Sequence, residues 1–402
     1  MSWILRTLLT ICLVTLPLYL YIGLRLAGSV GLVRPAAKRR ARRIALLVIG
    51  WFYTLPLAVF LLFIFKLDWR LTFFARSISW ADYLFNYPAW ISLIIVVELL
   101  GPFVVLDLVA LAGRLAPSQL PALRKLLAYV RLGLAALAIV YIPIRVAFDT
   151  THVRDTSERI SLPGLPSGLD SLTITLVGDI QVDRYTGESK VRQVHQIVDA
   201  HAPELLLSAG DVITSGTDFL VAASEAMCGM RGSLASVGVM GDHDYWSAPE
   251  AVRDLQLRCG WVFLQNEHRI IPYRGSTILI SGLTNVYSSR LNDDELDEFL
   301  GRAPKADLRI LLMHQPAERV IMRAAEKGYD LILAGHTHGG QIVLHPLGLT
   351  FTPSMRETRF YTGTHQVGSA KVVVTDGVGV SIAPIRYHAP AEVTTIVLQT
   401  PK

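Results

Sequence analysis

Two histidines separated by one residue follow a short apolar run near the end of the chain. The run 331–334 ends in Gly335, and His336 and His338 come next, in the sequence Gly-His-Thr-His-Gly-Gly. Residues i and i+2 leave an extended backbone on the same side, so both imidazoles can point at one place. Imidazole nitrogens are common metal ligands. The spacing predicts a metal site, although this motif alone fits a polar turn equally well.

Four apolar runs upstream also end in side chains that can bind a metal. The residues at these ends are Asp179, Asp211, the consecutive Asp242, His243 and Asp244, and His314. Short apolar runs between turn signals are typical of buried parallel strands. In open α/β sheets, functional groups gather beyond the carboxyl ends of the strands. Five strand ends that carry carboxylates and imidazoles therefore indicate one metal site.

The elements that would hold this site lie in the second half of the chain. Strand-like runs alternate there with expected helices at residues 188–201, 216–230, 248–258, 293–302 and 317–326. This alternation predicts an α/β domain with parallel strand pairing.

The first half of the chain is predicted to be a membrane region. Of 402 residues, 51% are hydrophobic and 18% charged, which is too apolar for one soluble domain. Four apolar stretches have bilayer length or close to it, at residues 4–26, 44–65, 89–112 and 132–148. We therefore predict three parts: a four-helix transmembrane region at 1–149, a linker with a first strand at 150–170, and a soluble domain at 171–402.

Basic residues indicate the orientation of this region. The loop after the first stretch carries six Lys and Arg side chains within residues 34–43, whereas the second loop carries three and the third four. Because Lys and Arg gather in cytoplasmic loops, we expect a multi-pass protein of the cell membrane with an extracytoplasmic soluble domain. The net charge of +5 then reflects topology and contact with membrane lipids. We expect no nucleic-acid partner, since the soluble half lacks interleaved arginines and aromatics.

Polar residues inside the predicted spans have two interpretations. Glu98, Asp107 and Arg145 lie at membrane depth. Such groups suggest transport or lipid handling, but Asp107 and Arg145 are near enough to span ends to pair with each other or reach water. We favour packing or pairing.

Two cysteines of the soluble part, Cys228 and Cys259, can pair if the domain faces an oxidising compartment. Sequence alone does not bring them together, so free buried cysteines are the favoured expectation.

The motifs as a set resemble a known superfamily. The order Gly-Asp-x-Gln, Gly-Asp, Gly-Asp-His-Asp, Met-His and Gly-His-Thr-His is similar to that of the calcineurin-like metallophosphoesterases. The segment 375–392 resembles their membrane-associated branch, which includes transmembrane proteins with a metallophosphoesterase domain. The resemblance covers about residues 156–400 and implies an α/β (α+β) fold, a β-sandwich flanked by helices. It also implies hydrolysis of a phosphoester or pyrophosphate bond by hydroxide activated at two divalent ions, Mn, Fe or Zn.

The resemblance also implies roles for individual residues. The ligands of the first ion would be Asp179, Asp211 and His338, with Gln181 beside them. Those of the second would be Asp211, Asp242, His314 and His336. His243 would lie beside the phosphate as proton donor or charge stabiliser, oriented by Asp244.

Two positions depart from the family pattern. Gln181 stands where histidine is usual, and its neutral carbonyl would be a weaker ligand. Asp242 stands where asparagine is usual, and its charge would tighten the second ion and damp its Lewis acidity. Asp183 is either a substitute ligand or a solvated loop carboxylate, and we favour the latter.

Three further residues are candidates for weaker roles. Arg359 and Arg386 could meet a substrate phosphate, although a structural ion pair fits each equally well. Gln341 is expected to hydrogen-bond the site.

Three functions remain open from the sequence. The favoured one is a membrane-anchored metallophosphoesterase acting on a phosphorylated small molecule or lipid, for example a cell-envelope precursor. The second is a binding or sensory protein on a decayed phosphoesterase scaffold, suggested by Gln181 and Asp242. The third is a transport or lipid-handling protein with an accessory hydrolase, suggested by Glu98 and Asp107.

Overall fold

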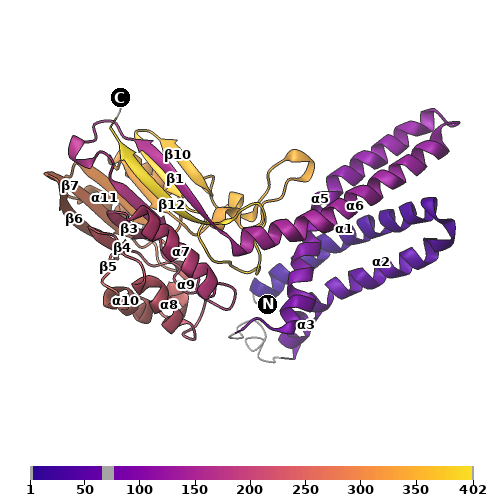
Figure 1. The fold of residues 1–402 in the computed structure, drawn as a ribbon, viewed down its shortest axis with the longest axis horizontal. Coiled ribbons are helices and arrows are strands. Elements are labelled where there is room, and N and C mark those ends of the chain that lie inside the picture. The colour runs from indigo at the N-terminus through magenta and orange to yellow at the C-terminus, as the bar shows by residue number, and fades with distance from the viewer. Residues whose placement is uncertain (1–2, 66–76, 401–402) are drawn as a thin grey trace. The chain divides into compact units, whose positions relative to one another are not determined.

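The computed structural model describes residues 3–65 and 77–400, and the ribbon in Figure 1 follows the chain through them. Contacts divide the chain into two units. One comprises Met1–Ala147 with Val343–Phe351, and the other Phe148–Ile342 with Thr352–Lys402.

The first unit is helical. Its helices are α1 (Trp3–Val33), α2 (Lys38–Phe52), α3 (Thr54–Ile64), α5 (Tyr87–Ala112) and α6 (Leu120–Thr151), the last of which runs into the second unit. Among the described residues, three stretches are long and apolar enough to cross a membrane, namely Thr10–Val33, Asp82–Leu115 and Leu120–Thr151.

The expected second span, residues 44–65, is divided between α2 and α3 at Tyr53. Pro56 has no N–H to donate to the carbonyl of Phe52, so a continuous helix would lose a bond there. The first turns of α2 carry Lys and Arg, and α3 has only 11 residues. Neither helix alone reaches the length of about 20 apolar residues that a bilayer requires. The count of four spans is therefore not confirmed.

Asp107 joins three helices of this unit. Its carboxylate pairs with Arg25 of α1 at 2.6 Å and with Arg131 of α6 at 2.5 Å. The hydroxyl of Tyr21 donates to it at 2.7 Å. Pairing is thus confirmed for Asp107, with partners other than the suggested Arg145.

The loop 343–351 groups with α5 although it lies far along the sequence. The backbone N–H of His345 donates to the Glu98 carboxylate at 2.8 Å. The side chain of Leu347 packs against Gly101, where a Cβ atom would collide with it. The glycine in the middle of α5 therefore makes room for this loop.

The second unit contains two six-stranded sheets (Figure 1). In spatial order, the first sheet consists of β1 (Val153–Ser161), β12 (Ala391–Gln399), β2 (Thr173–Val177), β3 (Leu205–Ser208), β4 (Ala235–Gly238) and β5 (Val262–Phe263). The second consists of β10 (Gly363–Val367), β11 (Ala370–Val374), β9 (Leu331–Ala334), β8 (Leu308–Met313), β7 (Ser276–Leu283) and β6 (Glu267–Tyr273). Pairing is parallel from β2 to β5 and from β7 through β8 and β9 to β11.

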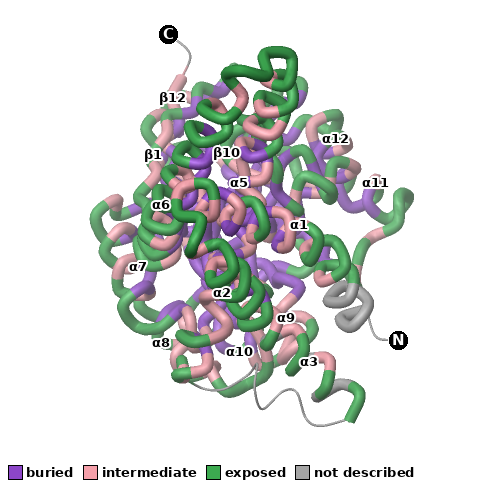
Figure 2. Tube along the Cα trace, turned by 90° about the vertical axis from the view of Figure 1, so that its right-hand side faces the viewer, coloured by how far each residue is buried: buried purple, intermediate pink, exposed green. Residues whose placement is uncertain are grey.

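The two sheets pack face to face and helices cover their outer faces. The helices of this unit are α7 (Glu188–His201), α8 (Leu220–Cys228), α9 (Asp242–Ser247), α10 (Pro249–Arg258), α11 (Asp293–Gly301) and α12 (Glu318–Glu326). Alternate strand residues such as Ile174 and Ile280 form the core between the sheets. Apolar faces of α7, α8 and α10 cover the first sheet, and those of α11 and α12 the second. Figure 2 shows these helices changing between buried and exposed residues along their length. The expected α/β sandwich is confirmed.

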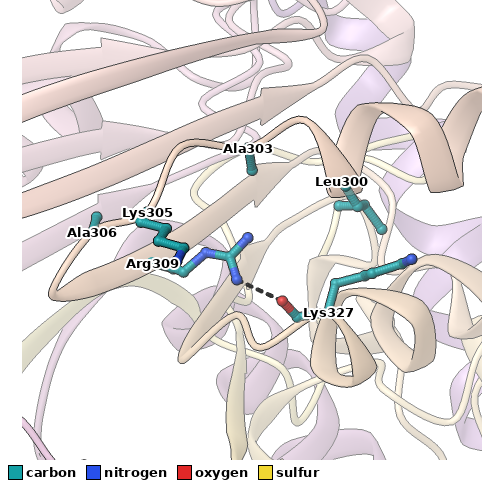
Figure 3. Close-up of a pocket in the computed structure, with 7 residues that line it drawn as sticks. Leu300, Ala303, Lys305, Ala306, Arg309 and Lys327 are labelled. Atoms are coloured by element: carbon teal, nitrogen blue, oxygen red, sulfur yellow. Dashed lines mark hydrogen bonds between the residues drawn. The ribbon is translucent and has the colours of Figure 1, made fainter.

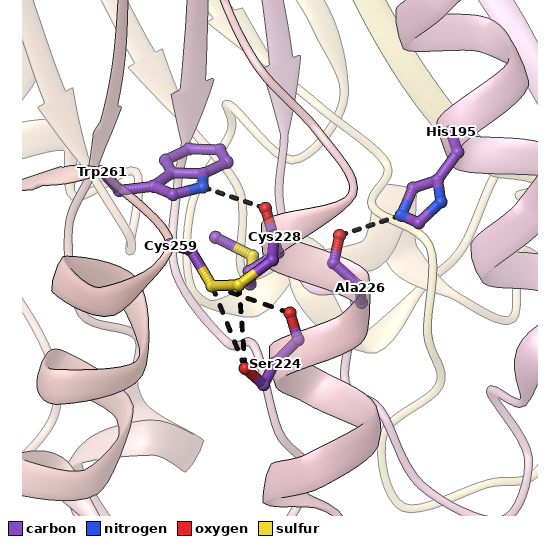
Figure 4. The surroundings of a disulfide bond; sticks show 7 residues. His195, Ser224, Ala226, Cys228, Cys259 and Trp261 are labelled. Carbon is purple, nitrogen blue, oxygen red and sulfur yellow. Dashed lines mark hydrogen bonds between the residues drawn. A yellow bond between two sulfur atoms is a disulfide. The ribbon is translucent and has the colours of Figure 1, made fainter.

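Cys228 and Cys259 form a disulfide, shown in Figure 4. Cys228 ends α8 and Cys259 follows α10, and these two helices pack together, which brings the two Cα atoms to 4.6 Å. The expectation of free cysteines was wrong, because the packing that joins the helices is not readable from local sequence. Cys12 is a free thiol.

Candidate metal centre

The five predicted strand ends meet at one place. Asp179, Asp211 and Asp242 follow β2, β3 and β4 of the first sheet, and His314 and His336 follow β8 and β9 of the second. Within each sheet these strands are parallel, so their carboxyl ends lie at the same edge. Because the two sheets pack face to face, the two edges deliver their side chains to a common site.

One group of possible metal ligands lies around Asp242. Its Oδ1 atom is 2.7 Å from Nε2 of His314 and 3.0 Å from Nδ1 of His336. The two imidazole nitrogens are themselves 3.2 Å apart. The ligand atoms all lie within 4.8 Å of one another, close enough to hold one ion.

The outer nitrogens of these two histidines have partners that fix the rings. Nδ1 of His314 is 2.8 Å from the carbonyl of Ala209, which can only accept, so this nitrogen carries the proton. Nε2 of His336 is 3.1 Å from a carboxylate oxygen of Glu357. Each ring therefore turns its other nitrogen to the site, as in metal-binding histidines held by a second layer of residues.

A second group surrounds Asp211. The carboxylates of Asp179 and Asp211 and the ring of His314 also offer ligand atoms within 4.8 Å of one another. Nε2 of His338 lies 3.6 Å from Oδ1 of Asp179. The amide nitrogen of Gln181 donates to Oδ2 of Asp211 at 3.2 Å.

The group around Asp211 leaves two buried oxygen atoms without partners. Within the described part of the chain, neither Oδ1 of Asp179 nor the carbonyl oxygen of Gln181 has a hydrogen-bond partner. Buried polar atoms are normally satisfied, so two orphaned oxygens among buried carboxylates are typical of a cation site. The donor set thus fits divalent ions.

Several of these residues adopt an unusual backbone. Asp179, Gln181, Asp211, His336 and His338 have positive φ angles of 50°, 45°, 55°, 72° and 52°. Side-chain-bearing residues rarely occupy this region, and such strain gathers at functional sites. Neighbouring glycines allow the close approach, because a Cβ at Gly241 or Gly335 would collide with the carboxylate of Asp211 or Asp179.

Burial and neighbouring charges shift the pKa values in opposite directions. Burial raises the pKa of Asp179 to about 6. Burial also opposes ionisation of Asp242, but hydrogen bonds from His314 and His336 outweigh it and lower the pKa of this carboxyl. Burial alone would lower the pKa of His336, but its bonds to Asp242 and Glu357 raise it to about 9. An incoming cation would therefore compete with a proton on His336.

Part of the second unit is similar in sequence to a known protein family. Residues 172–340 match the sequence model described as calcineurin-like phosphoesterase. This part of the chain belongs to that family. A transmembrane protein with metallophosphoesterase domain from Danio rerio is 28% identical over 250 residues, which are 60% of this chain and 56% of that protein.

Two bacterial relatives match this chain over most of their own length. The uncharacterized metallophosphoesterase YkuE of Bacillus subtilis is 26% identical over 254 residues, 62% of this chain and 87% of that protein. Phosphodiesterase YaeI of Escherichia coli is 24% identical over 230 residues, 56% of this chain and 81% of that protein. The chain spans little more than half of the Danio rerio relative.

His243 lies at the edge of the two ligand groups in the phosphoesterase domain. Its Nδ1 atom is 2.6 Å from the carbonyl of Thr214 and its Nε2 atom 3.3 Å from the Ser381 hydroxyl. Asp244 does not orient it. The Asp244 carboxylate instead accepts the backbone N–H groups of Val212, Ile213 and Gly241 at 2.9, 3.1 and 3.2 Å. Asp244 thus fixes the loop that carries Asp211. The carbonyl of Thr214 orients the ring of His243.

Arg386 is buried and cannot meet a substrate. Its side chain is fully covered and donates to backbone carbonyls that include those of Gly379 and Asp376, each at 2.8 Å. One guanidinium nitrogen lies 3.1 Å from Nδ1 of His338. Because arginine only donates, the proton of neutral His338 sits on Nε2, which faces Asp179. A metal bound at Nε2 of His338, in the group around Asp179 and Asp211, would displace that proton. Arg359 remains exposed, with its Nε atom 3.9 Å from Glu318.

Asp183 and Gln341, two further residues considered from the sequence, have structural roles. Asp183 is a partly exposed loop carboxylate whose oxygens accept from the N–H of Tyr185 and the hydroxyl of Thr214, at 2.7 and 2.9 Å. Gln341 bonds the carbonyls of Ala383 and Ile385 at 2.8 and 3.0 Å. It thereby fixes the segment that carries Ser381 against His243.

Glu357 and Tyr287 contact the site and were missed by sequence reasoning. The Tyr287 hydroxyl lies 3.2 Å from Nε2 of His336 and donates to Glu357 at 2.7 Å. Neither residue belongs to a strand end or a recognisable spacing, so no local signal pointed to them.

A separate pocket of about 500 Å³ lies at the amino end of β8, opposite the end that carries His314 (Figure 3). Lys305, Arg309 and Lys327 line it together with small and apolar residues. It contains none of the proposed ligands.

Proposed function

We propose that this chain is a membrane-anchored phosphoesterase that uses two divalent ions to hydrolyse a phosphoester or pyrophosphate bond. The observation that carries the proposal is the meeting of three buried aspartates and three histidines at strand ends of both sheets. Membership of residues 172–340 in the calcineurin-like phosphoesterases supports it, as do relatives named metallophosphoesterase and phosphodiesterase.

The two ligand groups would hold the ions with unequal strength. Asp242, His314 and His336, with Asp211, offer the tighter site because two imidazole nitrogens and a carboxylate oxygen already converge there. Asp179, Asp211, Gln181 and His338 offer the weaker one. Bound ions would supply an activated water and charge neutralisation at the phosphoryl oxygens.

His243 is suited to act on the departing oxygen. The Thr214 carbonyl fixes the proton on Nδ1. Burial disfavours the cation, but Asp211 and Asp242 outweigh this effect and raise the pKa of His243. This shift favours a second proton, on Nε2. This N–H can stabilise negative charge on a leaving oxygen or protonate it.

Membrane anchoring suggests the class of substrate. Three long apolar helices and the names of the relatives support attachment to a membrane. If α2 and α3 together complete a fourth crossing, both chain ends lie outside. The disulfide between Cys228 and Cys259 supports an oxidising, extracytoplasmic location for the domain. A phosphorylated lipid or cell-envelope precursor would meet the site there.

The test is metal content and turnover of the full chain purified in detergent. We expect two metal equivalents and metal-dependent release of nitrophenol from bis-p-nitrophenyl phosphate or p-nitrophenyl phosphate. Asp211→Asn, which alters both ligand groups, should lose metal and at least about a thousandfold in turnover. The exposed Asp199→Asn is the matched control and should behave as the unmodified protein.

A decayed scaffold with a binding or sensory role is the second candidate. Gln181 and Asp242, which stand where histidine and asparagine are usual, favour it, since a neutral glutamine is a weaker ligand for the group around Asp179 and Asp211. Absence of both metal and turnover in the purified protein would support this candidate and contradict the first.

A further inference from the structure

Two aromatic side chains stand exposed beside the metal ligands. Trp246, on α9, and Tyr287, after β7, are 54% and 48% exposed. Their ring centroids are 5.9 Å apart and their planes differ by 14°. We call this pair the aromatic ledge. Large aromatic rings usually bury most of their surface, so two that remain half open need a reason.

The aromatic ledge connects the two sides of the proposed phosphate position. The Trp246 ring centroid is 5.7 Å from that of His243. The Tyr287 ring centroid is 5.4 Å from that of His336, and its hydroxyl is 3.2 Å from Nε2 of His336. Any group attached to a phosphate held between His243 and His336 would therefore begin next to these rings.

Hydrogen bonds at the rims fix both rings. The indole N–H of Trp246 donates to the Ser288 hydroxyl at 3.1 Å. The Tyr287 hydroxyl donates to Glu357 at 2.7 Å, and the guanidinium carbon of Arg290 lies 5.3 Å from the centre of the Tyr287 ring. The ledge is thus pre-organised, which lowers the entropy lost when a ligand stacks on it.

We propose that the aromatic ledge binds a flat ring that the substrate carries next to its phosphate, a ring of the nucleobase kind. Two nearly parallel, fixed ring planes suit a planar π system, which stacks at a defined angle. A flexible acyl chain has no planar face, so it would not gain from parallel ring planes. The inference rests on the proposed function for the position of the phosphate, and it adds the class of the neighbouring group.

Paired substrates with one leaving group test the ledge in the full-length protein. Thymidine 5′-(p-nitrophenyl) phosphate and methyl p-nitrophenyl phosphate both release nitrophenol and differ only in the retained group. We expect kcat/KM at least about tenfold higher for the thymidine ester, mainly through KM. Trp246→Leu should bring the ratio near one, and Trp246→Phe should retain most of it.

A control and a competitor sharpen this comparison. Trp80→Leu removes an exposed tryptophan of the helical unit, 71% exposed, and should leave the ratio as it is. Octyl p-nitrophenyl phosphate presents a chain instead of a ring. A preference for the octyl ester that Trp246→Leu reduces as much as it reduces any thymidine preference would overturn the proposal.

A binding measurement separates this inference from the proposed function. Calorimetric titration with thymidine 5′-phosphate requires no turnover, so it remains informative in an inactive protein. We expect Kd to rise about tenfold in Trp246→Leu and little in Trp246→Phe. Equal Kd values in the unmodified and leucine proteins would refute the aromatic ledge. No turnover of any ester, with the Kd difference intact, would refute the phosphoesterase proposal alone.

Discussion

His336 is held from both sides, by Asp242 inside the site and by Glu357 outside it. The outer contact, 3.1 Å to Nε2, leaves Nδ1 free to face the ligand group. Tyr287 adds a second contact to the same nitrogen and to Glu357. Residues of this kind orient a ligand without touching the ion.

Replacing Glu357 should therefore weaken one metal position. In Glu357→Gln the neutral amide holds the His336 ring less firmly, and we expect one of two ions to bind about 10- to 100-fold more weakly. Competition with a chelating indicator measures this affinity. The exposed Glu326→Gln is the matched control. Loss of protein folding without a change in affinity of the folded fraction would contradict the assigned role.

Replacing Gln181 by histidine should strengthen the weaker metal position. Its carbonyl oxygen has no hydrogen-bond partner among the residues described, and it lies beside Asp211. Gln181→His would supply an imidazole nitrogen, a stronger ligand, to the weaker site. We expect the second metal equivalent to bind at lower free concentration and turnover to rise several-fold. If the second equivalent needs the same free metal concentration in both proteins, found by elemental analysis after dialysis against buffered metal, this side chain does not face the ion.

Residue types and spacing predicted which side chains meet, but not what holds them. All the predicted ligands lie in or beside the two groups, because strand ends with acidic and imidazole side chains carry a strong local signal. The roles of Asp244 and Arg386 depended on distant backbone groups, at Val212 and Asp376 for example. Sequence spacing contains no information on such contacts.

At the scale of elements, α7 carries a buried lysine whose charged form is disfavoured by its surroundings. Lys190 is 6% exposed and donates to the Val378 carbonyl at 2.6 Å. Burial, and then the charge of Arg386, lowers its pKa from 10.5 to about 7. Between these pH values the unfolded chain binds a proton that the folded chain lacks, so stability rises with pH across this window.

Lys190→Met should therefore stabilise the protein most below pH 7. The methionine avoids burying a cation, and we expect a melting temperature about 5 °C higher at pH 6. The difference should shrink toward pH 10, where the folded lysine is already neutral. Thermal unfolding followed by tryptophan fluorescence measures both values, with exposed Lys305→Met as control. A gain that is constant with pH would mean that packing rather than charge sets the effect.

The elements themselves were predictable where the pattern was local. The five expected helices of the soluble part correspond closely to α7, α8, α10, α11 and α12. The motif strands fall into two different sheets, which apolar runs alone do not reveal because each run looks the same in either sheet. The interruption near Pro56 was hidden by the uniform hydrophobicity of residues 44–65.

At the scale of the whole molecule, the compartment of the phosphoesterase domain is a testable expectation. Six basic side chains within residues 34–43 favour a cytoplasmic first loop. The disulfide favours an oxidising location for the domain. A C-terminal alkaline phosphatase fusion should be active in intact cells and a fluorescent-protein fusion dark. The opposite pattern would place the domain in the cytoplasm and predict reduced Cys228 and Cys259 by mass spectrometry.

The loop 343–351 has a consequence for anyone who cuts the protein into pieces. It belongs to the helical unit by contact, yet a fragment starting at residue 148 would keep it and lose Glu98 and Gly101. Its two ends adjoin Gln341 and Thr352, and the Thr352 hydroxyl bonds the Gly340 carbonyl at 2.7 Å, two residues from His338. In an excised domain this loop would lose its contacts with α5, and it would do so close in sequence to a proposed metal ligand. Metal binding or rates measured on such a fragment would describe an altered site.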